Sequence, residues 1–409
     1  MFEIYLSLVR PFFILGLEPF STDVLINLFL WLVSQKALRL TGDCDRIGQL
    51  SIEVSGEPKM SSVVRMKYSP FCLLALLLYY FLVSPVYGQG LTAGTLGGSA
   101  VRVGVGARTA AMGHTFTAVA DDVSSIYWNP AGLGQIKRPQ LTIMGADWLG
   151  GIRHGWIGFG QSLGKWMSVG ADVSYIWSGD IPQTIESEAD VGRYQEMGTF
   201  NYSDMIIRVA IGSGEISTNG YRGIDWGTIR IGGAFQVSQQ RVNYSTITGY
   251  QLRWNHINLG MIYRPPVKNL KLGLSIFNIG SSEQQYLQQP ISIPQHVRIG
   301  LAYTITISMP STAVNNTNMR PSLLQNQMTV AADFDFGYDQ NGRSHLGLEY
   351  LFSNGFAMRG GYRRRLDADF LSSLSGGFGY ATRAYQVDYA FIPFGQVGNA
   401  HRISLSLDF

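Results

Sequence analysis

Residues 402–409 at the end of the chain read RISLSLDF, and this stretch decides the fold class. Large apolar residues take every second position, alternating with polar ones: Ile403, Leu405, Leu407 and Phe409 against Arg402, Ser404, Ser406 and Asp408. Successive side chains of a β-strand point to opposite faces, so this strand has one apolar face and one polar face.

The same alternation recurs upstream. In 385–391 aromatic and aliphatic residues alternate with Gln386, Asp388 and Ala390, and in 328–338 they alternate with Asp333 and Asp335. Beyond residue 135 we find no convincing amphipathic helix. The pattern predicts fourteen strands at 139–148, 151–161, 166–178, 204–213, 225–239, 250–263, 270–279, 295–308, 326–338, 342–353, 355–365, 370–380, 383–391 and 400–409.

A strand with carboxylates on one face and large apolar groups on the other suits a wet lumen surrounded by lipid. In lipid every backbone group must be paired, and a closed barrel achieves this without an edge. The alternative is a soluble sandwich that buries the apolar faces, but no second pattern is present to cover them. We therefore expect an all-β, about 14-stranded antiparallel outer-membrane β-barrel, in which Ile403, Leu405, Leu407 and Phe409 form the C-terminal signal for the barrel assembly machinery.

An even number of strands places both ends of the barrel domain in the periplasm. The long connections 179–203, 240–249 and 280–294 then face outward, as is usual. The connection 309–325 is also long, although this strand count places it on the periplasmic side, where connections are usually short. Glycines recur inside the expected strands, among them Gly160, Gly232, Gly260 and Gly377. They suit a curved sheet or the close approach of a plug.

The composition excludes two classes of protein. The chain has 31 Lys and Arg against 28 Asp and Glu, a formal net charge of +3, without basic runs, which argues against a nucleic-acid partner. Only 14% of residues are charged and 12% are aromatic, which argues against disorder.

Residues 71–83 read FCLLALLLYYFLV, with Arg65 and Lys67 before them and Ser84-Pro85-Val86-Tyr87-Gly88 after them. This pattern predicts a secretory signal peptide at 60–88, cut between Gly88 and Gln89, because the run is short for a membrane-spanning helix. Residues 1–59 are expected to be a non-native or mis-annotated leader. Both cysteines, Cys44 and Cys72, precede the cut, so the exported part forms no disulfide and no thiolate site.

Residues 106–134 read GARTAAMGHTFTAVADDVSSIYWNPAGLG and show no strand alternation. Asp121 and Asp122 precede a short apolar stretch and predict a helix over 121–128 that ends at Asn129-Pro130. A compact segment ahead of a barrel can fold back into the lumen. We therefore expect a plug at 89–138 and the barrel at 139–409.

This stretch resembles the signature of the PorV/PorQ family of outer-membrane proteins, relatives of the FadL-type barrels. The matching plug-motif residues are Gly106, Ala107, Arg108, Met112, Gly113, Ala120, Asp121, Asp122, Trp128, Asn129, Pro130, Ala131, Gly132 and Leu133. Blocks 346–350, 357–362, 388–395 and 401–405 also resemble the family. The resemblance implies a FadL-like barrel of fourteen strands with an N-terminal plug, and a role beside type IX secretion, in which such proteins hold cargo C-terminal domains or act in attachment.

No residue pattern indicates an enzyme, and we expect no catalytic residue, no cofactor and no metal site. The six histidines lack metal-ligand spacing: His114 lies in the expected plug, and the others, His154, His256, His296, His345 and His401, lie on strands or their ends. Arg363-Arg364-Arg365 is either a solvated rim or an anchor for lipopolysaccharide. The acidic connection 179–203 could contact a partner.

Two functions follow for a protein of the cell outer membrane. The first, which the family resemblance favours, is an interaction protein whose loops or lumen mouth hold a type IX secretion component or a cargo domain. The second is a FadL-like channel for passive uptake of hydrophobic small molecules, gated by the plug.

Overall fold

The computed structural model describes residues 38–39, 49–54, 64–67, 101, 103–186, 194–219, 225–245, 249–280, 284–286, 289–291, 293, 295–307, 325–337, 340–364 and 373–409. The chain divides into two compact units, Met1–Pro85 and Val86–Phe409. In the first, three short strands pair antiparallel: β1 (Leu38–Arg39), β2 (Gln49–Val54) and β3 (Val64–Lys67). The predicted apolar run 71–83 and the cut at Gly88/Gln89 lie outside the described residues.

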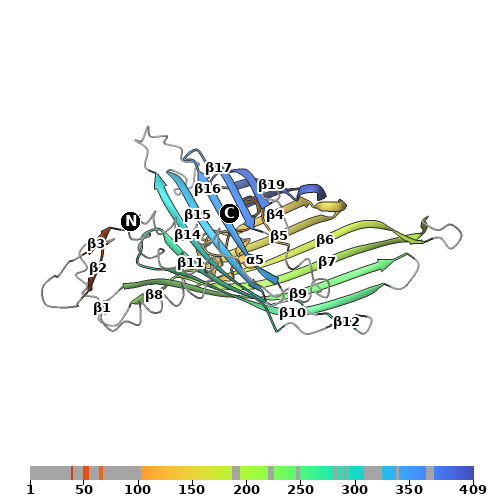
Figure 1. The fold of residues 1–409 in the computed structure, drawn as a ribbon, viewed down its shortest axis with the longest axis horizontal. Helices are drawn as coiled ribbons and strands as arrows, with labels where there is room; N and C mark the ends of the chain where they lie inside the picture. Colours follow the sequence, from red (N-terminus) through yellow and green to blue (C-terminus); the bar gives the residue numbers. More distant parts are fainter. Residues whose placement is uncertain are drawn as a thin grey trace, which may run out of the picture. The chain divides into compact units, whose positions relative to one another are not determined.

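The second unit is a closed antiparallel barrel of fourteen strands, as the alternation predicted (Figure 1). Neighbours in the sequence pair around the wall, β20 pairs with β4, and β9 pairs with β10, so the ring has no free edge. The strands are β4 (Gln140–Asp147), β5 (Arg153–Ser162), β6 (Met167–Glu186), β7 (Tyr194–Ser213), β9 (Asp225–Tyr244), β10 (Tyr250–Arg264), β11 (Leu270–Ile279), β14 (His296–Ile307), β15 (Asn326–Gly337), β16 (Gln340–Leu351), β17 (Phe356–Arg364), β18 (Leu374–Ala381), β19 (Tyr385–Pro393) and β20 (Asn399–Asp408).

The wall has a tall side and a short side. Strands β6, β7 and β9 have 20 residues each, whereas β18 has 8 and β19 has 9. Figure 1 shows the tall strands running past the others at the end of the barrel where β6 ends and β7 begins. We call this the loop end, and we call the opposite end, where β4 begins and β20 ends, the terminus end.

The prediction of a long loop over 179–203 was wrong, because β6 continues to Glu186 and β7 already begins at Tyr194. The pairing of the two strands passes through irregularities between Trp177 and Asp180 and between Gln183 and Thr184. The alternation is lost there because most residues of both faces are exposed in this extension, so its sequence carries no two-faced pattern.

Three short strands were not predicted. β8 (Ile216–Asn219) pairs with β9 at the terminus end, and β12 (Gln284–Tyr286) with β13 (Gln289–Ile291) forms a hairpin in the connection after β11. The expected long connection 309–325 lies almost entirely outside the described residues. Among the described residues, no helix combines the length and the hydropathy needed to cross a membrane.

The wall has its polar face inside and its apolar face outside. On β20, Arg402, Ser404 and Ser406 are buried, while Ile403 is 57% exposed and Leu405 39%. The same arrangement recurs around the ring, where Val209, Ile231 and other large apolar side chains are exposed. In water this surface would be unfavourable, whereas in a bilayer it meets lipid, so the barrel has the surface of a membrane-spanning protein.

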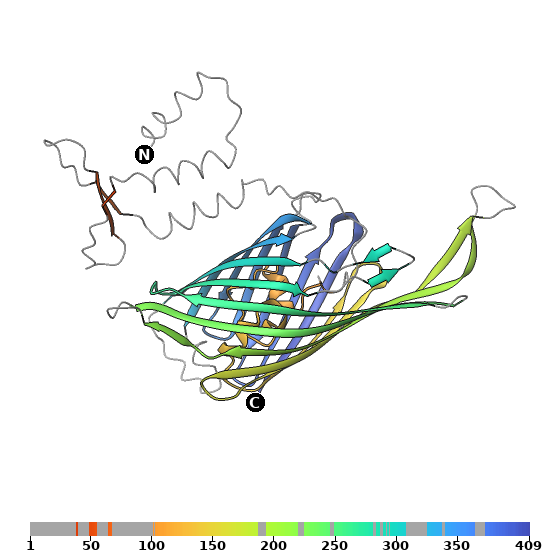
Figure 2. The same ribbon diagram turned by 90° about the horizontal axis from the view of Figure 1, so that it is seen from below.

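A plug fills the middle of the lumen (Figure 2). It contains α4 (Ala107–Ala111), α5 (Ser125–Trp128) and the 3-10 helix η2 (Pro130–Gln135). The helix predicted over 121–128 begins only at Ser125, because the Asp122 carboxylate accepts from Ser124 N at 2.9 Å and from Ser124 Oγ at 2.5 Å and forms a turn there. Helix α4 was not predicted, since its run of small residues has no apolar period.

The plug lies directly against inward glycines of the wall. At Gly361 of β17, an added Cβ would stand 1.9 Å from Gly113 N, so no other residue fits without moving the plug. Gly260 of β10 is equally tight, with an added Cβ 2.1 Å from Asn129 Oδ1. Similar seats on other strands are Gly160, Gly170, Gly212, Gly232, Gly273, Gly300, Gly347 and Gly377. Close approach of the plug therefore explains these inward glycines, whereas Gly233, Gly360 and Gly376 of the same strands have no plug atom within 4 Å.

Candidate functional site

The plug forms the hydrophobic core of the barrel. Trp128, Phe116, Met112, Ile126 and Leu133 are each at most 1% exposed, and they pack together with small wall residues. A soluble domain places such a cluster between layers of its own sheet or helices, whereas here it lies on the axis of a ring whose inner face is mostly polar. The apolar residues of the plug therefore pack mainly with one another.

The plug is held to the wall by hydrogen bonds from several strands. Asp333 of β15 accepts from Phe116 N at 2.9 Å, from Thr117 N at 3.0 Å and from Thr117 Oγ1 at 2.7 Å. Ser404 of β20 accepts from Ala107 N at 2.8 Å. All three bonds go to Asp333 Oδ2, while Oδ1 is buried without a hydrogen-bond partner among the described residues. Removing the carboxylate would leave two backbone N–H groups of the plug unpaired.

The motif Trp128-Asn129-Pro130-Ala131-Gly132 forms the turn in the centre of the plug. The Asn129 amide donates to Thr117 O at 2.7 Å and to Met261 O of β10 at 3.0 Å, while its Oδ1 accepts from Ala131 N at 3.2 Å. Pro130 begins η2, where its missing N–H costs nothing. Gly132 is required because a Cβ there would meet Ala120 O at 2.1 Å.

Trp128 is held on three sides. Its indole N–H donates to Val105 O at 3.0 Å, its backbone carbonyl accepts from Ser275 Oγ at 2.9 Å, and the Arg298 guanidinium lies 5.0 Å from its ring centroid. Of the remaining motif residues, Met112 is fully buried, and Gly113 has a φ of 66°, in the left-handed region that favours glycine.

Arg108 is the charged centre of the plug. Its guanidinium binds Glu349 of β16 with two hydrogen bonds of 2.8 Å and also contacts Asp121 at 2.5 Å and Asp122 at 3.3 Å. The sequence motif therefore brings Arg108, Asp121 and Asp122 together. Burial alone would lower the pKa of Arg108, but the carboxylates of Asp121, Glu349 and Asp122 raise it well above its ordinary value.

The ion pairs continue along the inner wall. Glu349 also accepts from Arg359 Nε at 2.6 Å, and Arg359 Nη1 donates to Asp388 at 2.8 Å. Burial raises the pKa of Asp122, and the more distant Arg108 lowers it by less, so the pKa lies above its ordinary value. Sequence reasoning missed Glu349, Arg359 and Asp388, although the inward parity of their strands would have identified them once the register was known.

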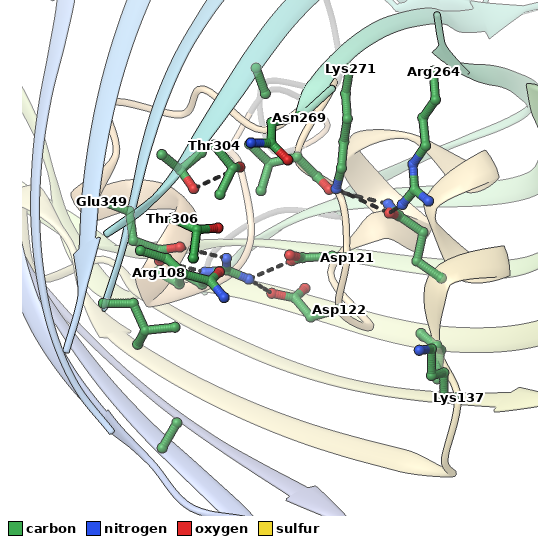
Figure 3. A pocket seen from close by; sticks show the side chains of 18 of the residues that line it. Arg108, Asp121, Asp122, Lys137, Arg264, Asn269, Lys271, Thr304, Thr306 and Glu349 are labelled. Atoms are coloured by element: carbon green, nitrogen blue, oxygen red, sulfur yellow. Dashed lines mark hydrogen bonds and ion pairs between the residues drawn. The ribbon is translucent and has the colours of Figure 1, made fainter. Parts of the chain in front are cut away.

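A cavity of about 1160 Å³ lies between the plug and the terminus end, and we call it the vestibule (Figure 3). The plug contributes Arg108, Asp121, Asp122 and Gln135 to its surface, and the wall contributes Arg264, Lys271, Glu349 and Arg359. Its lining is thus rich in charged and amide side chains. Such a space suits water and polar or charged groups rather than hydrocarbon.

The lumen on the loop-end side of the plug has the opposite character. Inward side chains of β6, β7 and β10 form an apolar group with residues that precede the plug and residues after β12. We call it the loop-end cluster: Val101, Ile176, Ile206, Leu252, Trp254 and Ile293, with Val103, Ile152, Tyr250 and Ile291 packed against it. Trp254 is 1% exposed. Sequence reasoning missed this cluster because Ile176, Ile206 and the β10 residues Leu252 and Trp254 lie on three strands whose inward faces cannot be aligned before the register is known.

A polar row on the inner wall separates the loop-end cluster from the plug. Arg208 binds Asp172 at 2.8 Å and Gln236 at 2.8 Å, and the row continues through Ser238 to His256 at 3.1 Å. Arg208 also lies 4.9 Å from the ring centroid of Tyr127 in the plug. The lumen therefore changes from apolar to polar before the plug is reached.

The remaining sequence candidates lie on the wall. Ile403 and Leu405 face outward on β20, where Leu407 is half-buried and Phe409 is 61% exposed at its end. Arg363 of β17 lies 5.8 Å from the Phe394 ring centroid and its Nη1 lies 3.5 Å from His114 Nδ1, so it faces the plug, whereas Arg365 lies outside the described residues. Within the described part of the chain, no group of three or more His, Cys, Asp or Glu side chains is placed to hold a metal.

Comparison with solved structures found membrane barrels of low sequence identity. The toluene transporter TbuX of Ralstonia pickettii aligns with a TM-score of 0.48 and 12% identity, covering 75% of this chain and 98% of that one. The toluene transporter TodX of Pseudomonas putida gives 0.47 and 12%, covering 74% and 96%. A FadL homologue of Pseudomonas aeruginosa gives 0.41 and 11%, covering 75% and 98%.

No curated protein matches the sequence at a significant level. The profile of the uncharacterised protein family UPF0164 matches residues 92–304, a span that covers more than half of the chain and includes the plug and the wall from β4 to β14. The chain belongs to the UPF0164 family.

Proposed function

We propose that the chain is a plugged channel of the cell outer membrane that passes small hydrophobic molecules. The observation that carries the proposal is the loop-end cluster. A lumen that only holds water is lined by polar side chains, whereas here Ile176, Ile206, Leu252 and Trp254 turn inward from three strands. Inward apolar side chains at the outer mouth give a hydrophobic molecule a place to leave water.

The apolar place is filled by the chain itself. Val101 and Val103, near the start of the plug segment, pack in the loop-end cluster together with Ile293. An arriving hydrophobic molecule would compete with Val101 and Val103 for the same surface. Because these residues lead into the plug, such competition links ligand binding to the position of the plug.

The barrel wall supports a passive route rather than a chemical one. The ring closes without an edge, its outer face is apolar, and the plug blocks the middle of the lumen through backbone contacts with the wall. Passage then requires movement of the plug, and the solute must cross the polar row of Asp172, Arg208 and Gln236. We expect small molecules to pass the plug and the polar row more easily than long-chain molecules do.

The resemblance to the PorV/PorQ family implies another role, as an accessory of type IX secretion that holds a partner or a cargo domain. Such a role would use the rim and the outer loops. Among the described residues, the features with a specific chemistry lie inside the lumen, which favours the channel. Recovery of secretion components with the purified barrel, together with an absence of uptake, would reverse this choice.

The test measures uptake of radiolabelled naphthalene by cells with an intact outer leaflet that produce the wild type or a variant. The double variant I206N and L252N places polar groups in the loop-end cluster and should slow uptake by about tenfold, as expected for a site that loses apolar contacts. The control I216N makes the same change on an Ile of β8 that is 44% exposed. The proposal would be contradicted if cells with the wild type, with the double variant, with I216N and without the chain all took up naphthalene at the same rate.

A further inference from the structure

The last residue of η2 joins the plug to two cations of the wall. Gln135 Oε1 accepts from Arg264 Nη2 at 2.6 Å and from Lys271 Nζ at 3.1 Å, and its Nε2 donates to Val119 O at 3.2 Å and to Ala120 O at 2.8 Å. Figure 3 shows the side chains of Arg264 and Lys271 converging at the surface of the vestibule. A neutral amide oxygen thus occupies the meeting point of two positive charges.

The charge at this point is not balanced by carboxylates. Arg264 also lies 3.3 Å from Glu215 Oε2, the same oxygen that Arg230 binds. Burial raises the pKa of Glu215, but Arg230 and Arg264 lower it by more, so Glu215 is ionised. Arg230, Arg264 and Lys271 therefore share one carboxylate and one amide in direct contact, and Asp121 of the plug also attracts Lys271, which leaves an excess of positive charge next to an open cavity.

Two further cations of the vestibule, Arg108 and Arg359, are differently placed. Arg108 binds Glu349, Asp121 and Asp122, and Arg359 binds Glu349 and Asp388. On that side of the vestibule carboxylates outnumber the guanidinium groups that they bind. An anion that enters the vestibule is therefore attracted to the β10–β11 side and repelled by the opposite side.

We propose that Arg264 and Lys271 form a binding site for an anionic group with two or more oxygens, a phosphate or a carboxylate, and that its binding displaces Gln135 Oε1. A charged acceptor forms stronger hydrogen bonds with a guanidinium and an ammonium than an amide does, and Arg presents a fork that fits two oxygens. The side chain of Arg264 is 34% exposed, so the group can reach it from the vestibule.

Displacement of Gln135 frees the end of the plug. Gln135 is the last residue of η2, which continues directly from the turn of Asn129. Loss of its two contacts with the wall leaves η2 held by its packing and by Asn129. The site thus regulates the plug from the terminus end, an inference that rests on the plug being the barrier of the proposed channel.

The experiment titrates inorganic phosphate into the purified full chain in detergent and measures binding by calorimetry. K271Q removes one cation and should weaken binding by about tenfold. Q135E supplies a carboxylate from the plug itself and should abolish binding. The control K268Q removes an exposed lysine that lines the same vestibule and should leave binding within about twofold.

Acetate distinguishes the two kinds of anion: if it competes with phosphate, a carboxylate uses the same site, and if it does not, the site is specific for phosphate. Both results support the proposal, provided that K271Q weakens phosphate binding. Hydrogen exchange of amides 131–135 should speed up when phosphate binds to the wild type and not to Q135E. Binding that K271Q and K268Q weaken equally, or that Q135E retains, would mean an adventitious ion only and would overturn the proposal. None of these measurements uses a hydrophobic solute, so a failure of naphthalene uptake with intact phosphate binding would refute only the channel.

Discussion

The two halves of the lumen on either side of the plug hold it by different physics. On the loop-end side, Val101 and Val103 pack with Leu252 and Trp254, and the contacts are apolar and non-directional. On the vestibule side, Arg108 fixes the plug to Glu349 by two hydrogen bonds of 2.8 Å. Packing tolerates a shape of similar volume, whereas an ion pair tolerates neither the loss of a charge nor a change of angle. Under the proposed function, a ligand would exchange with the loop-end contacts, while the Arg108 contacts define one closed position.

The largest effect should come from the charged half. R108M leaves Asp121, Asp122 and Glu349 without their main cation, and breaking a buried pair on one side costs about 3–5 kcal/mol. The free energy of unfolding in detergent, from urea titration, measures the loss. Adding Glu349→Gln to R108M should restore part of it, because one uncompensated charge is removed. A loss below about 1 kcal/mol would show that the ion pairs do not hold the plug.

The apolar half should respond with a smaller loss and no dependence on salt. L252A removes a side chain that is 6% exposed and should cost about 2–4 kcal/mol. Its cost should be equal at low and high NaCl concentration, whereas the cost of R108M should shrink in high salt, because Asp121 is 37% exposed. If both variants respond alike to salt, the two halves are not held by different forces.

Between the two halves, the backbone of the plug lies directly against glycines of the wall. G361A would place a Cβ at 1.9 Å from Gly113 N and should destabilise the closed plug by about 1–3 kcal/mol or more. The neighbouring G360A is the matched control, since nothing lies within 4 Å of its added Cβ. Protease sensitivity of the plug, compared between the two variants, distinguishes them. Equal sensitivity would contradict the close seating.

The smallest effect concerns pH. Burial, with Arg363, Arg402, His345 and Arg298 nearby, lowers the pKa of His114 well below 6.5. The unfolded chain then binds more protons than the folded chain below about pH 6.5, so stability falls as the pH falls, by at most about 1.4 kcal/mol per pH unit. H114N should reduce this slope in thermal unfolding between pH 7 and pH 5, and Asn also tolerates the φ of 67° at this position. An unchanged slope would mean that His114 does not contribute.

The sequence predicted the wall better than the site, for a physical reason. Alternation such as that in 402–409 is a local property of one strand, and it placed β20 and most other strands within a few residues. The prediction failed for the ends of β6 and β7, where both faces meet water and the pattern disappears. The family resemblance singled out Arg108, Asp121 and Asp122, but their partner Glu349 lies 241 residues away from Arg108 and became visible only with the register of the barrel.

The loop-end cluster and the anion site were also beyond sequence reasoning. Leu252 and Trp254 look like ordinary strand residues until their parity shows that they face inward. Arg264 and Lys271 are neighbours across the β10–β11 turn, but the partner that they share, Gln135, comes from the plug, 129 and 136 residues away. In both cases the chemistry arises from side chains that the folded barrel and its plug bring together.

The most direct test is the ion conductance of single barrels in planar lipid bilayers. A closed ring with a seated plug predicts that bilayers with the inserted wild type stay non-conducting, and that deletion of residues 103–135 opens steady pores. A wild type that conducts as well as the deletion variant would contradict the account, because the plug would then not be the barrier that separates the two halves of the lumen.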